Sequence, residues 1–284
     1  MSGTGGFDDP KGILKLLEQR ARRRFGQHFL SDMGIVNRIV RRSGVGEGSR
    51  VLEIGPGLGI LTHALVETGA DVTAVELDRD LADHIERVFP TVRLVRGDAA
   101  KQNWAELLGE GPWTVVANLP YNVGTTVVMQ LVRQPEIFSR IVVMLQKEVV
   151  DRMLAGPGSR TFGALSVQVQ ARAQGTHLLA VPPGSFFPAP KVHSSVIRLE
   201  THATPQVGNV TPKVFDRVVR AAFSHRRKTI VNSLAPLFGK DRARQALVTA
   251  GIDPSVRAEQ LGLGEYQALA EAIDALPSPS PDSR

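Results

Sequence analysis

The chain has 284 residues, no cysteine, and 34 lysine and arginine residues against 28 aspartate and glutamate residues, which gives a formal net charge of +6 at pH 7. The lack of cysteine excludes disulfides, thiolate zinc sites, cysteine nucleophiles and iron–sulfur chemistry, and no apolar run is long enough to span a bilayer. The length suffices for one large domain and a smaller one, and the positive charge indicates a polyanionic partner.

The first 24 residues form a basic arm that we expect to be flexible. Their apolar content is too low for a secretory signal, and Asp8, Asp9 and Glu18 argue against an organellar transit peptide. We therefore expect a cytoplasmic protein. The arm ends in the residues Arg22, Arg23 and Arg24. Such a run either contacts phosphates or is a solvated charge cluster.

The first predicted helix of the folded part lies between Asp32 and Gly44. Asp32 is a good N-cap and Gly44 a natural C-terminal stop. The apolar positions of this segment, which recur at helical spacing, are Ile35, Val36, Ile39 and Val40. We expect this stripe to face the core and the arginines between its members to face solvent.

The stretch from Val51 to Thr62 organises the rest of the chain. An apolar run of strand character leads through Gly55, Gly57 and Gly59 into a helical pattern that stops at Gly69. A buried strand, a glycine-rich turn and a helix N-terminus form the first unit of a doubly wound nucleotide-type fold. Glycines there allow a ligand to lie against bare backbone, although such turns also occur without a ligand.

The details of this turn favour S-adenosylmethionine over other nucleotides. The glycine spacing differs from the dinucleotide fingerprint, and no Gly-Lys-Ser/Thr follows, so a phosphate-binding loop is excluded. Glu53 precedes the loop, where it would repel a pyrophosphate but suit a cationic adenosyl ligand. Glu76 ends the next strand, and its carboxylate offers acceptors for both ribose hydroxyls.

Strands and helices alternate along the next hundred residues. The predicted strands after the first are 71–75, 92–95, 113–117 and 141–145, with a helix from Lys147 to about Ala155. This alternation predicts a mostly parallel sheet with helices on both faces. Asp98 follows the third strand, where it either accepts a hydrogen bond from the adenine amino group of the cofactor or caps the next segment.

The fourth strand leads into Asn118-Leu-Pro-Tyr121, a turn suited to methylating an adenine amino group. That nitrogen is a poor nucleophile, and acceptors for its two N–H bonds would favour the pyramidal transition state. We expect the Asn118 side-chain carbonyl and the Leu119 backbone carbonyl to accept these two hydrogen bonds, on a turn stiffened by Pro120. Tyr121 would stack on the flipped-out base. No general base is required, because the methylated amine can lose its proton to water.

Two later segments are candidates for RNA contact. Gly156–Gly163 is a polar loop that we expect to form a lid or an RNA-contacting loop. Phe186 and Phe187 lie among prolines between two predicted paired strands, 176–181 and 194–199. We expect them to be poorly placed for a core, with one exposed at the rim to stack on a base.

The sequence divides near residue 205. Residues 1–204 form the predicted catalytic domain, and 205–284 a helical RNA-binding domain that begins after a Pro- and Gly-containing linker. The helical part contains a dense basic turn with Arg226, Arg227 and Lys228. The seven histidines show no metal-ligand spacing, so we expect no metal.

Together these segments closely resemble the ribosomal RNA adenine dimethyltransferases of the KsgA (RsmA) type. The motifs that carry the resemblance are Phe25-Gly-Gln-His-Phe-Leu30, Glu53-Ile-Gly-Pro-Gly-Leu-Gly59, Glu76-Leu-Asp78, Gly97-Asp98, Asn118-Leu-Pro-Tyr-Asn122, Met144-Leu-Gln-Lys-Glu-Val149, Phe186-Phe-Pro-Ala-Pro-Lys-Val192 and Arg226-Arg-Lys-Thr229. The resemblance implies a Rossmann-like class I S-adenosylmethionine-dependent methyltransferase, with a mostly parallel seven-stranded sheet and a small all-α C-terminal domain.

The resemblance also implies roles for individual residues. The S-adenosylmethionine site would be lined by His28, Leu30, Gly55, Glu76, Asp98 and Asn118. Asn118 and Tyr121 would hold the target adenine, and Phe186 would stack on its other face. Two departures stand out: His28 replaces an asparagine found in many members, and Phe187 a small polar residue.

The implied activity is transfer of four methyl groups to N6 of two adjacent adenosines in the 3′-terminal hairpin loop of small-subunit rRNA. The partner would be an assembling small ribosomal subunit. The protein itself would be a monomer without membrane attachment. Two alternatives remain open at this point. One is the related large-subunit rRNA methyltransferase of the macrolide-resistance type, and the other is a non-catalytic RNA-binding assembly or transcription factor on the same fold.

Overall fold

A computed structural model of the protein describes residues 28–225 and 227–277. The predicted flexible basic arm (residues 1–24), with Arg22, Arg23 and Arg24, and the residue Arg226 lie outside the described residues. The chain divides into two compact units. We call them the sheet unit, whose described residues are 28–150 and 175–201, and the helical unit, residues 151–174 and 202–277 except 226.

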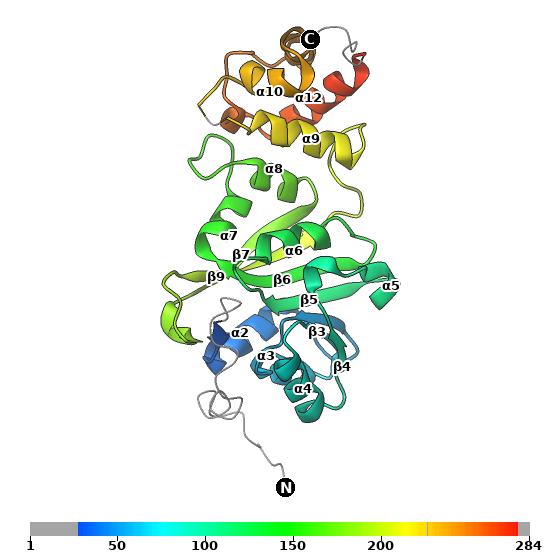
Figure 1. The fold of residues 1–284 in the computed structure, drawn as a ribbon, viewed down its shortest axis with the longest axis vertical. Coiled ribbons are helices and arrows are strands. Elements are labelled where there is room, and N and C mark those ends of the chain that lie inside the picture. The colour runs from blue at the N-terminus through cyan, green and yellow to red at the C-terminus, as the bar shows by residue number, and fades with distance from the viewer. Residues whose placement is uncertain (1–27, 226, 278–284) are drawn as a thin grey trace. The chain divides into compact units, whose positions relative to one another are not determined.

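The sheet unit is built on a seven-stranded sheet in the order β4-β3-β2-β5-β6-β9-β7 (Figure 1). Its strands are β2 (Arg50–Ile54), β3 (Asp71–Glu76), β4 (Arg93–Arg96), β5 (Trp113–Asn118), β6 (Phe138–Gln146), β7 (Ala173–Val181) and β9 (Ser194–Thr201). The first five strands in that order pair in parallel, and β9 pairs antiparallel with β6. The predicted mostly parallel sheet is confirmed. The order reverses at β2 and β5, and such a switch point opens a crevice at the carboxyl ends of the strands.

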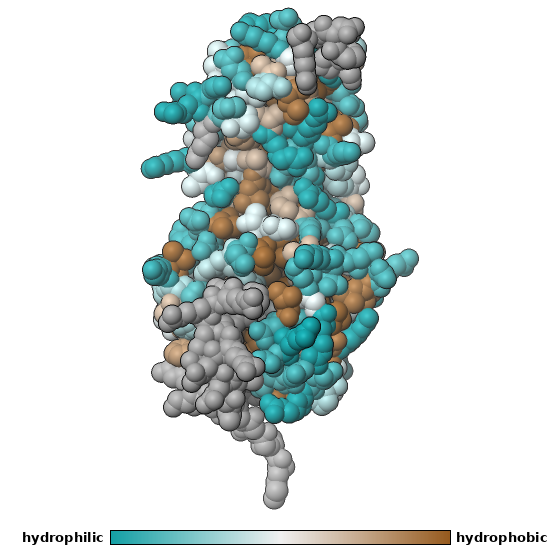
Figure 2. Space-filling model, viewed as in Figure 1, coloured by the Kyte–Doolittle hydropathy of each residue, from teal (hydrophilic) through white to brown (hydrophobic). Residues whose placement is uncertain are grey.

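Helices connect the strands of this sheet. They are α2 (Met33–Ser43), α3 (Ile60–Val66), α4 (Arg79–Val88), α5 (Trp104–Leu108) and α6 (Gly124–Leu131), with short 3₁₀ turns η1 (Ala99–Lys101) and η2 (Pro183–Ser185). The apolar faces of α2, α3 and α4 form one continuous core with strand side chains such as Val51 and Val142. The visible outer face of α4 is hydrophilic (Figure 2), as expected of a helix that buries one stripe.

The start of the described chain is tied to the segment after β7. The Asp32 side chain accepts a hydrogen bond from the Ile35 N–H at 3.1 Å, which confirms the predicted N-cap, and Gly44 ends α2 in a left-handed conformation. Before α2, β1 (Phe29–Leu30) pairs antiparallel with β8 (Phe186–Phe187). This two-stranded sheet was not predicted, because each strand has only two residues.

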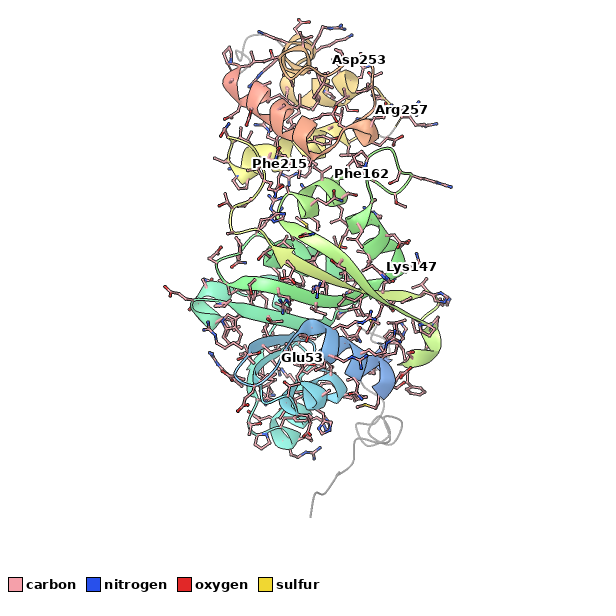
Figure 3. The ribbon with its side chains drawn as sticks, turned by 180° about the vertical axis from the view of Figure 1, so that it is seen from behind. Glu53, Lys147, Phe162, Phe215, Asp253 and Arg257 are labelled. Atoms are coloured by element: carbon pink, nitrogen blue, oxygen red, sulfur yellow. The ribbon has the colours of Figure 1, made fainter. Side chains whose placement is uncertain are left out.

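The helical unit has its own apolar core. Its helices are α8 (Ala164–Gln170), α9 (Pro212–Ala222), α10 (Ile230–Phe238), α11 (Lys240–Thr249) and α12 (Leu263–Ala275), with the 3₁₀ turn η3 (Ala258–Gln260), while α7 (Lys147–Leu154) enters it from the sheet unit. Phe162 and Phe215 are both buried in that core (Figure 3). The predicted wholly helical character of the C-terminal part is therefore confirmed.

Two expectations about this region differ from the structure. We expected a single boundary near residue 205, whereas residues 151–174 group with the C-terminal helices and the return to them begins at His202. The loop 156–163 was expected to be a lid or an RNA-contacting loop; the lid alternative does not fit, since Gly158 donates its N–H to the Glu259 carbonyl at 2.7 Å and Phe162 is 3% exposed, and RNA contact stays a prediction. Because both anchors lie inside the helical unit, this loop is part of that unit's packing.

Candidate active site

A cavity lies within the sheet unit at the carboxyl ends of β2, β3 and β5. It holds about 730 Å³ of empty space, a volume that includes open solvent. Its lining residues come from the start of the described chain, the glycine-rich turn, the end of β3 and the turn after β5: His28, Phe29, Leu30, Glu53, Gly55, Pro56, Gly57, Leu58, Ile60, Leu61, Glu76, Asn118, Leu119, Pro120 and Tyr121. Segments 90 residues apart thus meet where the fold places a ligand.

The glycine-rich turn forms one wall of the cavity. Gly55 has φ +68°, and no described heavy atom lies within 4 Å of the place that a Cβ on it would take. Gly57 has φ +58°, and a Cβ on it would lie 3.1 Å from the Phe29 ring. These backbone conformations favour glycine. The space in front of Gly55 is therefore left for a ligand, while Phe29 closes the turn from the other side.

Glu76 stands at the end of β3 with both carboxylate oxygens engaged. Oε2 accepts a hydrogen bond from the Gly57 N–H at 3.1 Å, and Oε1 accepts one from the Asp78 N–H at 3.0 Å. Burial raises the pKa of Glu76, and the backbone hydrogen bonds oppose that rise. The two oxygens together offer about four lone-pair sites, so the carboxylate can accept a further hydrogen bond from a ligand hydroxyl.

Glu53, near the carboxyl end of β2, is the most deeply buried acid in the cavity. Its side chain is 1% exposed, and its Oε2 has no hydrogen-bond partner among the described residues. Burial raises the pKa of Glu53 to about 8, while the Thr62 side chain opposes the rise and the nearby Glu76 carboxyl adds to it. A buried carboxylate oxygen without a hydrogen-bond partner is costly, and a cationic ligand in the cavity would relieve that cost. Figure 3 labels this residue on its strand.

Asn118 ends β5 and faces the segment before β1. Its Nδ2 donates a hydrogen bond to the His28 backbone carbonyl at 3.1 Å. A carbonyl can only accept, so this contact fixes which end of the amide points away from His28. Oδ1 has no hydrogen-bond partner among the described residues, so it is the acceptor that Asn118 can offer in the cavity that it lines.

The rest of the turn is held by its neighbours. Leu119 is 1% exposed, and its N–H donates to the Met144 carbonyl at 3.2 Å, while the Pro120 carbonyl accepts from Gly124 N–H at 2.9 Å. The Tyr121 hydroxyl lies 2.7 Å from the Ser194 hydroxyl. Burial raises the pKa of Tyr121, partly offset by Ser194, so the ring stays neutral and fixed at the cavity mouth.

The aromatic pair of β8 behaves differently from the expectation. Phe186 is 4% exposed and belongs to the core of the sheet unit, where it pairs with Leu30, so the prediction that both rings are poorly placed for a core was wrong for Phe186. Phe187 is 39% exposed and pairs with Phe29. Leu30 itself lines the cavity and is buried.

Asp98 does not line the cavity. It follows β4, and its Oδ1 accepts a hydrogen bond from the Ala100 N–H at 2.9 Å, while Oδ2 lies 3.8 Å from Lys101 Nζ. The cap alternative for Asp98 is therefore observed. The N–H of Gly97, the residue before Asp98, donates to the Glu76 carbonyl at 2.8 Å. Asp98 therefore directly follows a residue that is hydrogen-bonded to the cavity wall.

The predicted RNA-contacting residues lie elsewhere. Arg227 and Lys228 are exposed on the helical unit between α9 and α10, and Arg226 and the arginines 22–24 lie outside the described residues. Residues 28–225 and 227–277 contain no group of three or more histidine, aspartate or glutamate side chains arranged to hold a metal. In the same part of the chain, no helix has the length and apolar character needed to cross a membrane.

Sequence reasoning missed two polar contacts that shape the cavity. Ser194 holds Tyr121 across 73 residues, and Pro188 holds the His28 ring across 160 residues. Neither pairing leaves a local pattern in the sequence. Glu53 carried a usable signal, since an acid inside an otherwise apolar buried strand is rare.

The parallel sheet with its switch-point cavity, joined to a helical C-terminal part, defines a Rossmann-like class I S-adenosylmethionine-dependent methyltransferase, and the predicted fold class is confirmed. The sequence profile of the family described as "Ribosomal RNA adenine dimethylase" matches residues 18–275. The chain belongs to this family, as predicted, and is therefore an rRNA-modifying methyltransferase.

Relatives with similar sequences carry one name, "Ribosomal RNA small subunit methyltransferase A". The protein from Syntrophotalea carbinolica is 42% identical over 90% of this chain and 98% of its own length. Those from Pseudomonas aeruginosa and Thermosynechococcus vestitus are also 42% identical, over 93% and 90% of this chain and 99% and 98% of their own lengths.

Two solved structures share the fold. A dimethyladenosine transferase from Plasmodium falciparum has a TM-score of 0.70 and 23% identity, covering 85% of this chain and 96% of its own. The 23S rRNA methyltransferase ErmE has a TM-score of 0.64 and 24% identity, covering 87% and 99%. At these identities the likeness describes the architecture and leaves the substrate to be argued from the site.

Proposed function

We propose that this protein transfers methyl groups from S-adenosylmethionine to N6 of two adjacent adenosines in the 3′-terminal hairpin loop of small-subunit rRNA, giving N6-dimethyladenosines during small-subunit assembly. The observation that carries the proposal is the fixed orientation of Asn118, whose Oδ1 is left as an acceptor beside the cavity. The common name of the relatives supports the choice of the small subunit.

The residues of the cavity fit the methyl donor, which supplies an electrophilic methyl group on a sulfonium. Glu76 would accept hydrogen bonds from the ribose hydroxyls with its remaining lone pairs. The Glu53 carboxyl, whose Oε2 has no hydrogen-bond partner among the described residues, would offset the positive charge of the donor. Gly55 would let the ligand approach the backbone, and His28 and Leu30 would line the same side. Asp98 would contact the adenine ring only after giving up or sharing its cap.

The target base would enter at the turn after β5. Oδ1 of Asn118 and the Leu119 carbonyl would accept hydrogen bonds from the amino group, so that nitrogen, methyl carbon and sulfur are aligned. Tyr121, held by Ser194, would stack on the extruded base. On the opposite face we propose the β8 strand, where the resemblance names Phe186 and the exposed ring is that of Phe187.

Basic residues on both units supply RNA contacts. Arg227 and Lys228 are exposed on the helical unit, and with Arg226 and Arg22, Arg23 and Arg24 they form the proposed phosphate contacts. In the sheet unit, Arg38 and Arg41 project from the solvent side of α2, directly after the cavity-lining strand β1. We propose that a monomer acts on the assembling small subunit in the cytoplasm, with no metal.

A labelled methyl-transfer assay tests the proposal. Undermethylated small subunits, undermethylated large subunits and free rRNA are incubated with the protein and S-adenosylmethionine labelled on the methyl group, and the product nucleosides are separated. We expect label in N6-dimethyladenosine from the small-subunit RNA. Label confined to large-subunit RNA would favour the resistance-type enzyme, and binding without label would favour a non-catalytic assembly factor.

A further inference from the structure

His28 sits between the two loops that shape the mouth of the cavity. Its Nδ1 lies 2.8 Å from the Pro188 carbonyl, in the segment after β8. Its ring centroid lies 5.6 Å from that of Tyr121, with the planes tilted by 32°. Its own backbone carbonyl holds the Asn118 amide. One residue thus joins the base-stacking side of the site to the turn that orients the amine acceptor.

The Pro188 contact decides where the imidazole carries its proton. A carbonyl oxygen accepts hydrogen bonds and never donates, so Nδ1 must be the donor at 2.8 Å. In the neutral ring the other nitrogen, Nε2, then has a bare lone pair. No described residue makes a hydrogen bond to Nε2, and it lies on the side of the ring away from Pro188.

The setting of Nε2 matches a need of the proposed reaction. His28, Tyr121 and Asn118 line one cavity, so a base stacked on Tyr121 and bonded to Asn118 brings its amino group to the same mouth. Among the described residues, the other titratable or charged groups on the surrounding elements are Asp32, Glu53, Glu76, Tyr121, Lys191 and His193. Glu53 and Glu76 are buried behind the glycine turn, and the Tyr121 hydroxyl is engaged by Ser194.

We propose that His28 is a catalytic residue that accepts, at Nε2, the proton shed by the adenine amino group at each methylation. The proposal rests on the proposed adenine-methylating function. The N6 lone pair forms a bond to the methyl carbon, the carbon–sulfur bond breaks, and its electron pair stays on sulfur. In the same step, as positive charge develops on the nitrogen, the amino group passes one proton to Nε2, and the imidazolium releases that proton to water before the next round.

This role also gives a reason for histidine at a position where many members carry asparagine. An asparagine amide can donate to the Pro188 carbonyl as His28 does, but it cannot take up a proton at neutral pH. The exchange therefore adds a proton acceptor without removing the loop contact. The expected gain is modest, because water can also take the proton from a methylated amine.

The first experiment compares pH–rate profiles. Single-turnover transfer of labelled methyl groups to undermethylated small subunits, at saturating donor and subunit, is measured from pH 5.5 to 9 for the wild type, His28→Asn and His177→Asn; the last makes the same change at an exposed histidine of β7. Imidazole ordinarily changes charge between about pH 5 and 8. We expect the wild-type and His177→Asn rates to fall as pH drops through this range and His28→Asn to lose this limb.

At pH 8 we expect His28→Asn to be slower than wild type by about 10- to 100-fold, at or below the low end of the usual contribution of about 10²–10⁴ for a proton-transfer residue. A limb that persists in His28→Asn belongs to another group, such as Glu53, and would overturn the proposal. A His28→Ala variant adds a second readout, since exogenous imidazole should restore its rate in proportion to the neutral imidazole concentration. Failure of this rescue in a folded variant would also count against the role.

A third readout does not depend on turnover. In ligand-free protein with ¹⁵N-labelled histidine, the resonances missing from His28→Asn identify the His28 ring, and their shifts report which nitrogen is protonated. We expect Nδ1 protonated and Nε2 bare above neutral pH. The Nε2-protonated tautomer would overturn the proposal. If the wild type transfers no methyl group to any RNA while the tautomer is as expected, the proposed function fails, whereas a transferring wild type with an unchanged His28→Asn profile refutes the inference alone.

Discussion

Both units bury ionisable side chains, but in the helical unit they are paired with each other, whereas in the sheet unit one carboxyl oxygen has no partner among the described residues. In the helical unit, Arg172 and Asp216 are 1% and 5% exposed, and Arg172 Nη2 lies 2.9 Å from Asp216 Oδ1 while Nη1 donates to the Gln168 carbonyl at 2.9 Å. In the sheet unit, the equally buried Glu53 has no partner for its Oε2 among the described residues. The Arg172–Asp216 pair therefore satisfies its charges within the protein, whereas the Oε2 atom of Glu53 is available to a ligand.

The difference separates a structural charge from a functional one. A paired buried charge contributes little net stability, but removal of one partner leaves an uncompensated charge. An unpaired buried carboxyl lowers stability until a ligand satisfies it. Substitutions at the two places should therefore change stability in opposite directions, and only the second should alter ligand binding.

Breaking the ion pair should give one of the largest losses of stability. Asp216→Ala leaves Arg172 buried without its carboxylate, so we expect a loss of about 3–5 kcal/mol in the free energy of unfolding. Urea unfolding measured by circular dichroism gives the value. Asp274→Ala, at an exposed site on α12, is the control and should change it by less than about 0.5 kcal/mol. Equal effects of the two variants would show that the pair does not act as a buried unit.

Asn118→Ala should strongly lower turnover, with little effect on stability. Loss of a positioned group that bonds the reacting amine is expected to lower the rate by about 10²–10³. The folded state loses the contact to the His28 carbonyl, worth about 1 kcal/mol, and RNA affinity should stay within a fewfold. Rates come from labelled methyl transfer and affinity from filter binding. Unchanged turnover would remove Asn118 from the chemistry.

Glu53→Gln should stabilise the ligand-free protein at alkaline pH. The pKa of Glu53 is raised from 4.5 to about 8. Ionisation of this carboxyl therefore destabilises the folded protein. The penalty is absent below pH 4.5, grows between pH 4.5 and 8, and is constant above pH 8. We expect a gain of about 5 kcal/mol at pH 9 and none at pH 4. Calorimetry should also show weaker S-adenosylmethionine binding. A gain that does not depend on pH would contradict the assignment of the unpaired charge.

The two phenylalanines of β8 should separate stacking from packing. Phe187→Ala removes an exposed ring. If that ring stacks on a base, we expect the activation free energy of methyl transfer to RNA to rise by about 1–3 kcal/mol. Thermal stability should not change. Phe186→Ala should cost about 3–5 kcal/mol of stability, because it empties part of the core. Thermal unfolding and transfer rates are measured for both variants. If only Phe186→Ala lowers turnover, and that variant is stably folded, Phe186 is the stacking residue.

The basic turn should give the smallest effect. Replacing Arg227 and Lys228 with glutamine removes two exposed charges, so the slope of log affinity against log salt should flatten by about 1.4–1.8 if each contacts a phosphate. Small-subunit binding measured at several salt concentrations gives the slope. Arg244→Gln, an exposed arginine on α11, is the control. An identical slope in the double variant would mean that these side chains only face solvent.

Much of the sheet unit could be predicted from the sequence because its signals are local. The run from Val51 to Thr62 contains a strand, a turn and a helix in order, and Asp32 and Gly44 mark both ends of α2. The pairing of β1 with β8 could not be predicted, since two-residue strands have no period and their partners are more than 150 residues apart. For the same reason the burial of Phe186 was missed.

The candidate site was predictable in its chemistry but not in its geometry. Glu76 and Asn118 were identified by their place after parallel strands, and both line the cavity. Asp98 satisfies the same sequence rule yet caps a 3₁₀ turn, because a strand end determines a residue's edge of the sheet and not where its side chain points. The hydrogen bond that orients Asn118 comes from the His28 backbone, which no side-chain pattern reveals.

The most direct test of the account is the position of S-adenosylhomocysteine, the demethylated donor, in crystals of this protein. We predict that its ribose hydroxyls lie within about 3.2 Å of the Glu76 carboxylate, with its sulfur directed at the Asn118 side chain. A ligand bound elsewhere, or in this cavity with Glu76 out of reach, would contradict the account.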